Sequence, residues 1–285
     1  MTNVPAKPSP FKSANDAHAI VETVIFCEFS PPLSPDLMEH LQSLKETLKD
    51  DLPVFRPLIH VSFTFDGATN QQTSKTNERG FEMTSNPRDG VIDWVVRIDE
   101  NAVSIHCLNY IRWIGFWEKT EKILTNILSL LKGGESFLTN LGLRVIDRFI
   151  YDGDEKSYDA TQLFKHDGLL LPQHVLTSGP LWHAHLGWYD SPKEGQKVLS
   201  QLNIDSIYAN INNEPKVTAT IEHNCIYRIN VGNLNPTNLL TPAKGQDETL
   251  LSKMALNLHI INKVLLSNLL TDQTQKQINL DVPND

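Results

Sequence analysis

Residues 19–30 read AIVETVIFCEFS, and residues 141–151 read LGLRVIDRFIY. Both stretches are rich in β-branched and aromatic residues and alternate in part between apolar and polar positions, which is typical of a β-strand. Each opens the same order of expected elements: a strand, a short helix or irregular insert, several more strands and a long amphipathic helix. Because this order occurs twice, over 19–132 and over 141–270, the sequence indicates an internal duplication.

The segment after the first strand carries the signals of a helix start. Ser34 suits the N-cap, Pro35 suits the first helical position, and Asp36 suits the positive end of the helix dipole. The leucines that follow recur at helical spacing and fall on one face: Leu37, Leu41, Leu44 and Leu48. A short helix with one buried stripe is therefore predicted here.

A long amphipathic helix is predicted at the end of each run. The first covers 109–132 and stops at Gly133 and Gly134. The second covers 248–270, and its apolar residues step by three and four to form a narrow seam: Leu251, Met254, Leu258, Ile261 and Leu265. A seam of this kind packs on one partner helix, so it could cross the chain's own sheet or form an interface with a second chain.

The second run adds a strand at 181–190 and a three-strand meander over 203–212, 216–222 and 225–231, with turns at 212–215 and 223–224.

The predicted fold class is α+β, with two similar halves that each consist of a mainly antiparallel sheet packed on a long amphipathic helix, as in saddle or helix-grip arrangements. The expected organisation is a flexible N-terminal tail, a first half, a second half and a C-terminal tail: 1–18, 19–134, 135–275 and 276–285. A binding cleft is expected where the halves meet.

Composition limits the classes of function. The chain has 285 residues, with 25 Lys and Arg against 34 Asp and Glu, which gives a net charge of -9. This balance disfavours general binding to nucleic acids or anionic membranes, because phosphate contacts need clustered cations. We expect neither a signal peptide nor a membrane span, since no apolar stretch reaches about 18 residues. The cysteines Cys27, Cys107 and Cys225 form no CxxC pair, and a cytoplasmic location is expected.

One histidine motif points to catalysis. His60-Val61-Ser62-Phe63 resembles the H-x-[ST]-apolar pattern of two-histidine phosphoesterases, which use one such motif from each of two repeats as acid and base. The second repeat offers only His183 and His185, without Ser or Thr at the required offset. His60 and Ser62, with His183 or His185, are therefore the catalytic candidates, and the alternative is a hydrogen-bonded structural histidine.

The spacing of His183 and His185 also suits a metal. An i, i+2 pair on a strand points to one face, with the residues about 7 Å apart. A site needs a third ligand, and the sequence selects none of the candidates: His60, His106, His223 and Asp190. No metal and no cofactor is assigned.

Arginines in an apolar strand suggest a ligand site. Arg144 and Arg148 share a face and could grip an anion, while Asp147 lies on the other face. The alternative is an ion pair between Arg144 and an acidic residue of the long helix over 109–132, with Arg148 exposed. Trp182 could stack on a planar ligand, or it could belong to the core.

Four stretches resemble a sporadically distributed family of uncharacterised bacterial proteins. They are Ile20–Ile25, similar to its "veavi" start; Tyr110–Glu118, similar to a "Y..W..F" helix entry; Leu141–Phe149, similar to an "iGLRYiNrf" strand; and Leu258–Asp272, similar to an "LHe…F…LTd" ending. The resemblance implies a cytoplasmic bacterial protein of unassigned activity, associated with mobile elements, toxin–antitoxin loci or phage defence. It carries over no catalytic residue.

Together these patterns favour a non-enzymatic binding or interaction protein, with a protein partner or a second copy of the chain. The alternative is a hydrolase of phosphodiesters or nucleotides that uses His60 with His183 or His185.

Overall fold

The computed structural model describes residues 9–15, 17–66, 71–86, 90–193, 196–230, 234–242 and 247–281. Side chains are not described at 60–66, 71–73, 75–77, 192–193 and 196. The chain divides into two compact units. Unit 1 comprises Met1–Thr23, Gly142–Tyr227 and Met254–Asp285, and unit 2 comprises Val24–Leu141 and Arg228–Lys253.

The strands of the described residues form a ten-stranded, mostly antiparallel sheet in the order β3-β4-β5-β6-β2-β7-β10-β9-β8, with β1 paired to β7. Their bounds are β1 Phe11–Ser13, β2 Ile20–Ser30, β3 Val54–Asp66, β4 Gln71–Thr84, β5 Trp94–Asp99, β6 Ala102–Cys107, β7 Phe137–Tyr151, β8 Trp182–Lys193, β9 Gln196–Ile211 and β10 Glu214–Arg228. The predicted fold class, two similar halves with a sheet and a long helix each, is therefore wrong. Alternation along a strand fixes which face is buried, but it does not fix which strand lies beside it.

The helices are α1 Pro35–Leu41, α2 Leu44–Thr47, α3 Trp113–Leu130, α4 Gln173–Leu176, α5 Leu250–Leu269 and α6 Asp272–Gln277, with 3-10 turns at Glu155–Ser157, Ala160–Gln162 and Pro236–Leu240. The predicted start of α1 is confirmed, because the side chain of Ser34 accepts a hydrogen bond from the backbone N–H of Leu37 at 3.3 Å. Within the part of the chain that is described, no helix is both long and apolar enough to cross a membrane.

Unit 2 contains the antiparallel strands β3, β4, β5 and β6 and the helix α3. The indole of Trp94 on β5 stacks on the ring of Phe116 on α3, with the ring centroids 5.9 Å apart and the planes 10° apart. A short antiparallel hairpin joins β5 to β6. The carboxylate of Asp99 accepts hydrogen bonds from the backbone N–H groups of Asn101 and Ala102.

Replacing Gly80 by Ala should destabilise unit 2 by about 2 kcal/mol, because added atoms in a packed site force the backbone to shift. A Cβ on Gly80 would lie 2.1 Å from the carbonyl oxygen of Ile98 on the neighbouring strand. Urea unfolding followed by circular dichroism measures the loss. The matched control is Gly90→Ala, where a Cβ meets no atom within 4 Å and only the φ of +79° is unfavourable. Equal losses in the two variants would contradict the close approach.

Unit 1 contains β8, β9 and β10, joined in antiparallel register. Asn212 and Asn213, with φ of 53° and 67°, make the two-residue turn between β9 and β10. The predicted turn at 223–224 is wrong, because β10 runs unbroken from Glu214 to Arg228. His223 and Asn224 are polar residues typical of turns, but here His223 points into the core, where α5 supplies its partner.

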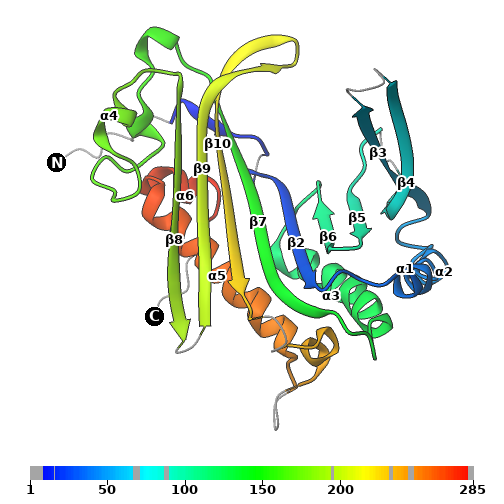
Figure 1. Ribbon diagram of the computed structural model, residues 1–285. Coiled ribbons are helices and arrows are strands. Elements are labelled where there is room, and N and C mark those ends of the chain that lie inside the picture. The colour runs from blue at the N-terminus through cyan, green and yellow to red at the C-terminus, as the bar shows by residue number, and fades with distance from the viewer. Residues whose placement is uncertain are drawn as a thin grey trace. The chain divides into compact units, whose positions relative to one another are not determined.

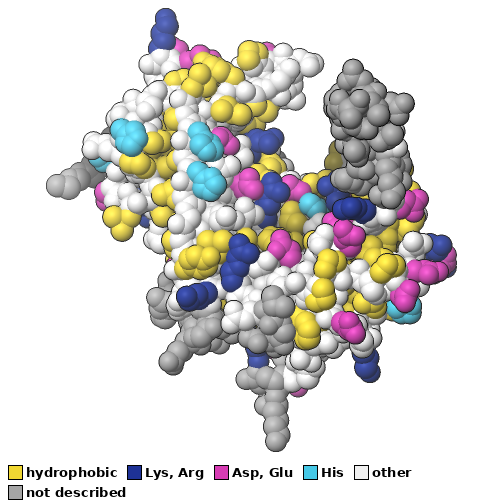
Figure 2. All heavy atoms as spheres, viewed as in Figure 1, with side chains coloured by type: hydrophobic (Ala, Val, Ile, Leu, Met, Phe, Trp, Pro, Cys, Tyr) yellow, Lys and Arg dark blue, Asp and Glu magenta, His cyan; other side chains and the backbone are white. Residues whose placement is uncertain are grey.

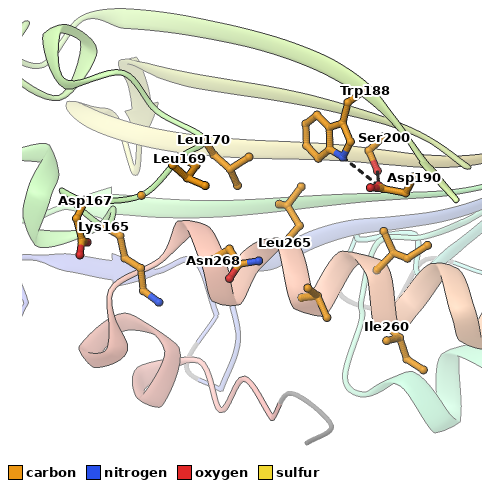
Figure 3. Close-up of a pocket in the computed structure, with 13 residues that line it drawn as sticks. Lys165, Asp167, Leu169, Leu170, Trp188, Asp190, Ser200, Ile260, Leu265 and Asn268 are labelled. Carbon is orange, nitrogen blue, oxygen red and sulfur yellow. Dashed lines mark hydrogen bonds between the residues drawn. The ribbon is translucent and has the colours of Figure 1, made fainter. Parts of the chain in front are cut away.

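The helix α5 lies against the inner face of these strands (Figures 1 and 3). The core of unit 1 includes Phe149, Leu202, Ile204 and Ile221 from the strands and Leu265, Leu266 and Leu269 from α5. Residues 11–13, which lie within the predicted N-terminal tail, form β1 against β7, and Phe11 is fully buried.

Candidate binding site

The two histidines of β8 lie on the exposed face of unit 1. The imidazole Nδ1 of His183 is 2.6 Å from a carboxylate oxygen of Asp205, and His185 is exposed beside it on the strand. Figure 2 shows histidine side chains over this part of the sheet. The side chains of the other two catalytic candidates, His60 and Ser62, lie outside the described residues. Among the residues that are described, no three His, Cys, Asp or Glu side chains gather as a metal site would require.

The arginine strand is arranged as the sequence predicts. Arg144 and Arg148 are partly exposed on one face of β7, and Asp147 is buried on the other. The guanidinium Nε of Arg144 lies 2.8 Å from a carboxylate oxygen of Glu222, so its charge is already paired within unit 1. The acidic partner therefore comes from β10, and the prediction that the long helix over 109–132 supplies it is wrong. Burial raises the pKa of the Asp147 carboxyl to about 7.

The predicted helix seam and Trp182 contribute to packing. Four of the five seam residues are buried by the chain itself: Leu251, Met254, Leu258 and Leu265. The fifth, Ile261, is partly exposed and lines a cavity. The indole of Trp182 packs edge-on against Phe164, with the ring centroids 5.7 Å apart, at the border of the core of unit 1.

A cavity of about 660 Å³ opens between α5, the strands β8 and β9, and the loop 165–170 (Figure 3). Six of the side chains on its wall are apolar: Leu169, Leu170, Ile260, Ile261, Val264 and Leu265. The polar side chains on its wall are Lys165, Asp167, Trp188, Asp190, Ser200 and Asn268. A concave, largely apolar space with a few polar groups is the usual form of a small-molecule site.

A carboxylate with two donors marks one end of this cavity. The indole N–H of Trp188 donates to Oδ2 of Asp190 at 3.0 Å, and the hydroxyl of Ser200 donates to the same oxygen at 3.1 Å. No hydrogen bond from a described residue reaches the other carboxylate oxygen, Oδ1, so it can accept one from a bound molecule. Asp190 is half-buried, and it forms no ion pair with any residue that the structure describes.

The buried residue His223 packs against Trp188, the cavity residue that donates to Asp190. The ring of His223 stacks on Trp188, with the centroids 6.5 Å apart and the planes 15° apart. Nδ1 of His223 is 2.9 Å from Oδ1 of Asn262 on α5, and this oxygen can only accept, so Nδ1 carries the hydrogen. Burial lowers the pKa of the imidazole to about 4, so the ring is neutral at pH 7.

Cys225 approaches this histidine but is not an activated nucleophile. Its sulfur lies 3.3 Å from Nε2 of His223, and both residues are almost fully buried. Burial, aided by the charge of Asp190, raises the pKa of the Cys225 thiol well above its usual value. A thiolate–imidazolium pair is therefore disfavoured, and the contact serves packing.

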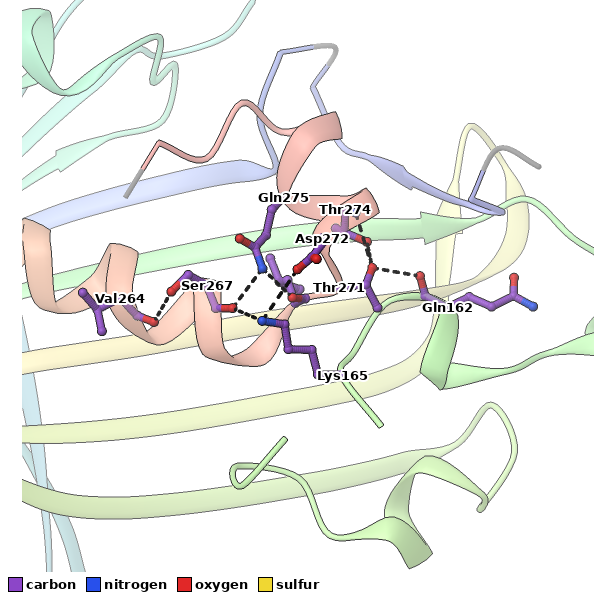
Figure 4. A network of polar contacts seen from close by, with 9 residues as sticks. Gln162, Lys165, Val264, Ser267, Thr271, Asp272, Thr274 and Gln275 are labelled. Carbon is purple, nitrogen blue, oxygen red and sulfur yellow. Dashed lines mark hydrogen bonds and ion pairs between the residues drawn. The ribbon is translucent and has the colours of Figure 1, made fainter. Parts of the chain in front are cut away.

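At the opposite end of the cavity, polar side chains form hydrogen bonds to the C-terminal end of α5 (Figure 4). The ammonium of Lys165 donates to the carbonyl oxygen of Ser267 at 2.8 Å and lies 3.8 Å from the carboxylate of Asp272. The amide of Gln275 donates to the carbonyls of Ser267 and Leu270. Cations are favourable at a helix C-terminus, so Lys165 holds the loop 165–170 against α5 and its charge is already engaged.

Sequence reasoning missed the cluster of Trp188, Asp190 and Ser200, although Asp190 is among its candidates for a third metal ligand. A signal was present. Alternation in β8 puts Ala184, Leu186, Trp188 and Asp190 on one face, and a carboxylate that ends an apolar face requires a partner. What the alternation could not show is that the loop 165–170 and α5 enclose this face.

Comparison of the chain with models of protein families finds no match, and comparison with curated proteins finds none either. The resemblance to a sporadically distributed bacterial family therefore stays a prediction.

Proposed function

We propose that this chain is a non-enzymatic binding protein that holds a small, largely apolar molecule in the cavity of unit 1. The observation that carries this proposal is the cavity of about 660 Å³, with six apolar side chains on its wall and a cluster of hydrogen-bonding groups around Asp190 at one end. Apolar walls supply affinity through the burial of surface, while a few placed polar groups orient the ligand.

The polar groups of the cavity favour binding over hydrolysis. General acid–base catalysis needs two groups that exchange protons at the reacting atoms. The titratable residues on the described wall are Lys165, Asp167 and Asp190, and the nearby imidazole of His223 stands behind Trp188. The alternative hydrolase with His60, the cytoplasmic location, the protein partner and the link to a defence locus all stay predictions.

The neutral dye N-phenyl-1-naphthylamine should bind unit 1 saturably, at one molecule per chain, with a rise in fluorescence. Val264→Trp should weaken this binding about tenfold or more, because the indole would occupy space that the apolar ligand needs. Val264 is 41% exposed and lines the cavity, so the core is not disturbed. Fluorescence titration of the purified chain measures both effects.

The matched control is Leu256→Trp, which adds the same ring on the same helix. Leu256 is also 41% exposed but is not part of the cavity wall. Leu169→Ser is a second probe, since Leu169 is fully exposed at the wall and its loss should weaken dye binding without destabilising the fold. Equal dye binding by the Val264 and Leu256 variants would reject the cavity as the site.

A further inference from the structure

We infer that the molecule bound in the cavity of unit 1 carries an ammonium head with N–H groups, as an alkylamine does, and that Asp190 recognises this head. The inference rests on the proposed function and specifies its ligand. Three features of the cavity carry it: the state of the Asp190 carboxylate, the balance of charge on the wall, and the apolar surface that separates its two ends.

The described residues satisfy the carboxylate of Asp190 only in part. The two donors among them, Trp188 and Ser200, are both neutral and both reach Oδ2. A carboxylate that is partly removed from water is costly unless it is paired and hydrogen-bonded. An ammonium N–H directed at Oδ1 would supply both the charge and the missing hydrogen bond, and such charge-assisted bonds are about twice as strong as neutral ones.

The remaining charges on the wall do not supply this partner. Lys165 is the one cation on the described wall, and its ammonium is bound to the carbonyl of Ser267 near Asp272. Figure 3 shows Lys165 and Asp190 at opposite ends of the cavity, with Leu265 between them. Asp167, on the same loop as Lys165, adds a second carboxylate that is exposed. The field in the cavity therefore favours a cation.

The surface between the two ends selects the body of the ligand. Leu170, Ile261 and Leu265 offer only apolar contacts along this path, so a hydrocarbon chain attached to the ammonium would be covered. The indole of Trp188 lies beside the carboxylate that it donates to, and its ring can also attract a cation through its π face. Because Oδ1 accepts a hydrogen, an ammonium that bears N–H groups is favoured over a quaternary one.

The test compares four ligands that share one tail: octylammonium, octyltrimethylammonium, 1-octanol and octanoate, titrated by calorimetry at pH 7. Octylammonium should bind about tenfold or more tightly than 1-octanol, the ratio expected for one charge-assisted hydrogen bond. Octyltrimethylammonium should fall between the two, and octanoate should bind most weakly. These comparisons use the unmodified protein, so they stand even if a variant fails to fold.

Asp190→Asn should then abolish the preference for octylammonium while leaving the affinity for 1-octanol within about threefold, because the side chain keeps its size. The matched control is Glu214→Gln, which removes an equal charge from an exposed position of unit 1 that does not line the cavity and should preserve the preference. Equal binding of octylammonium and 1-octanol to the unmodified protein would overturn the inference and leave the proposed function in place. Failure of all four ligands and of the neutral dye to bind would overturn both.

Discussion

Replacing Asp147 by Asn should raise the free energy of unfolding at pH 8 by up to about 4 kcal/mol. Burial of this carboxyl raises its pKa from 3.8 to about 7 in the folded chain, and each pH unit of difference between the folded and unfolded states is worth about 1.4 kcal/mol. Asp147 is only 2% exposed, so solvent screens this penalty little. The amide has the same shape and carries no charge, so it removes the penalty.

The sign of the pH dependence follows from proton uptake. Between about pH 4 and pH 7 the folded chain holds a proton on Asp147 that the unfolded chain has lost, so this group's contribution falls as the pH rises. Below about pH 4 both states are protonated, and the contribution vanishes. Asp147→Asn should therefore match the unmodified protein near pH 4 and exceed it increasingly up to pH 8.

Urea unfolding at a series of pH values, followed by circular dichroism, measures this difference. Asp167→Asn is the control, because Asp167 is exposed and its replacement should change stability by less than about 0.5 kcal/mol. A variant at Asp147 that is less stable than the unmodified protein at pH 8 would show that the buried carboxylate is charged and well hydrogen-bonded.

Local signals placed several elements correctly. The first quoted stretch forms β2, Ile20–Ser30, and the second lies inside β7, Phe137–Tyr151. Ser34 caps α1, and the long helices α3 and α5 fall within the predicted ranges. These features depend on hydrogen bonds and side-chain periodicity within a few residues, so the sequence is sufficient to predict them.

Pairing between distant strands could not be predicted in the same way. The strand order puts β2 between β6 and β7, and β7 between β2 and β10, so strands of the supposed separate halves are neighbours. The compact units also interleave along the chain, since residues 137–141 of β7 belong to unit 2 and residues 142–151 to unit 1. A repeated order of elements reflects the local sequence pattern of each segment. It contains no information on which strands pair with each other.

The candidate site could be predicted from the sequence only in part, because residues from three separate segments of the chain form it. The alternation of polar and apolar residues along 181–190 made His183 a candidate site residue. The structure places His183 on the exposed face, next to Asp205. Asp190 and Ser200 lie on adjacent strands, and the loop 165–170 and α5 complete the wall around them. Only a tertiary structure reveals that enclosure, and only burial reveals that His223 is a neutral core residue.

Acid should destabilise unit 1 through His223, with an effect opposite in sign to that of Asp147. Burial lowers the pKa of His223 from 6.5 to about 4 in the folded chain. Between pH 6.5 and about pH 4, the imidazole is therefore protonated in the unfolded chain and neutral in the folded chain. Stability therefore falls as the pH drops through this window, by about 3 kcal/mol for this residue. Burial, together with the charge of Lys263, lowers the pKa of His259 to about 4 as well, which adds to the loss.

His223→Asn isolates the first contribution. The amide N–H can donate to Asn262 where Nδ1 does now, while the group can no longer titrate. The smaller side chain should cost about 2 kcal/mol at pH 7, but the loss of stability between pH 7 and pH 4 should shrink by about 3 kcal/mol. The control is His185→Asn on the exposed face, and urea unfolding from pH 4 to pH 7 measures both variants. An acid loss that His223→Asn leaves unchanged would mean that the folded chain accommodates the imidazolium, which its burial beside Trp188 and Cys225 argues against.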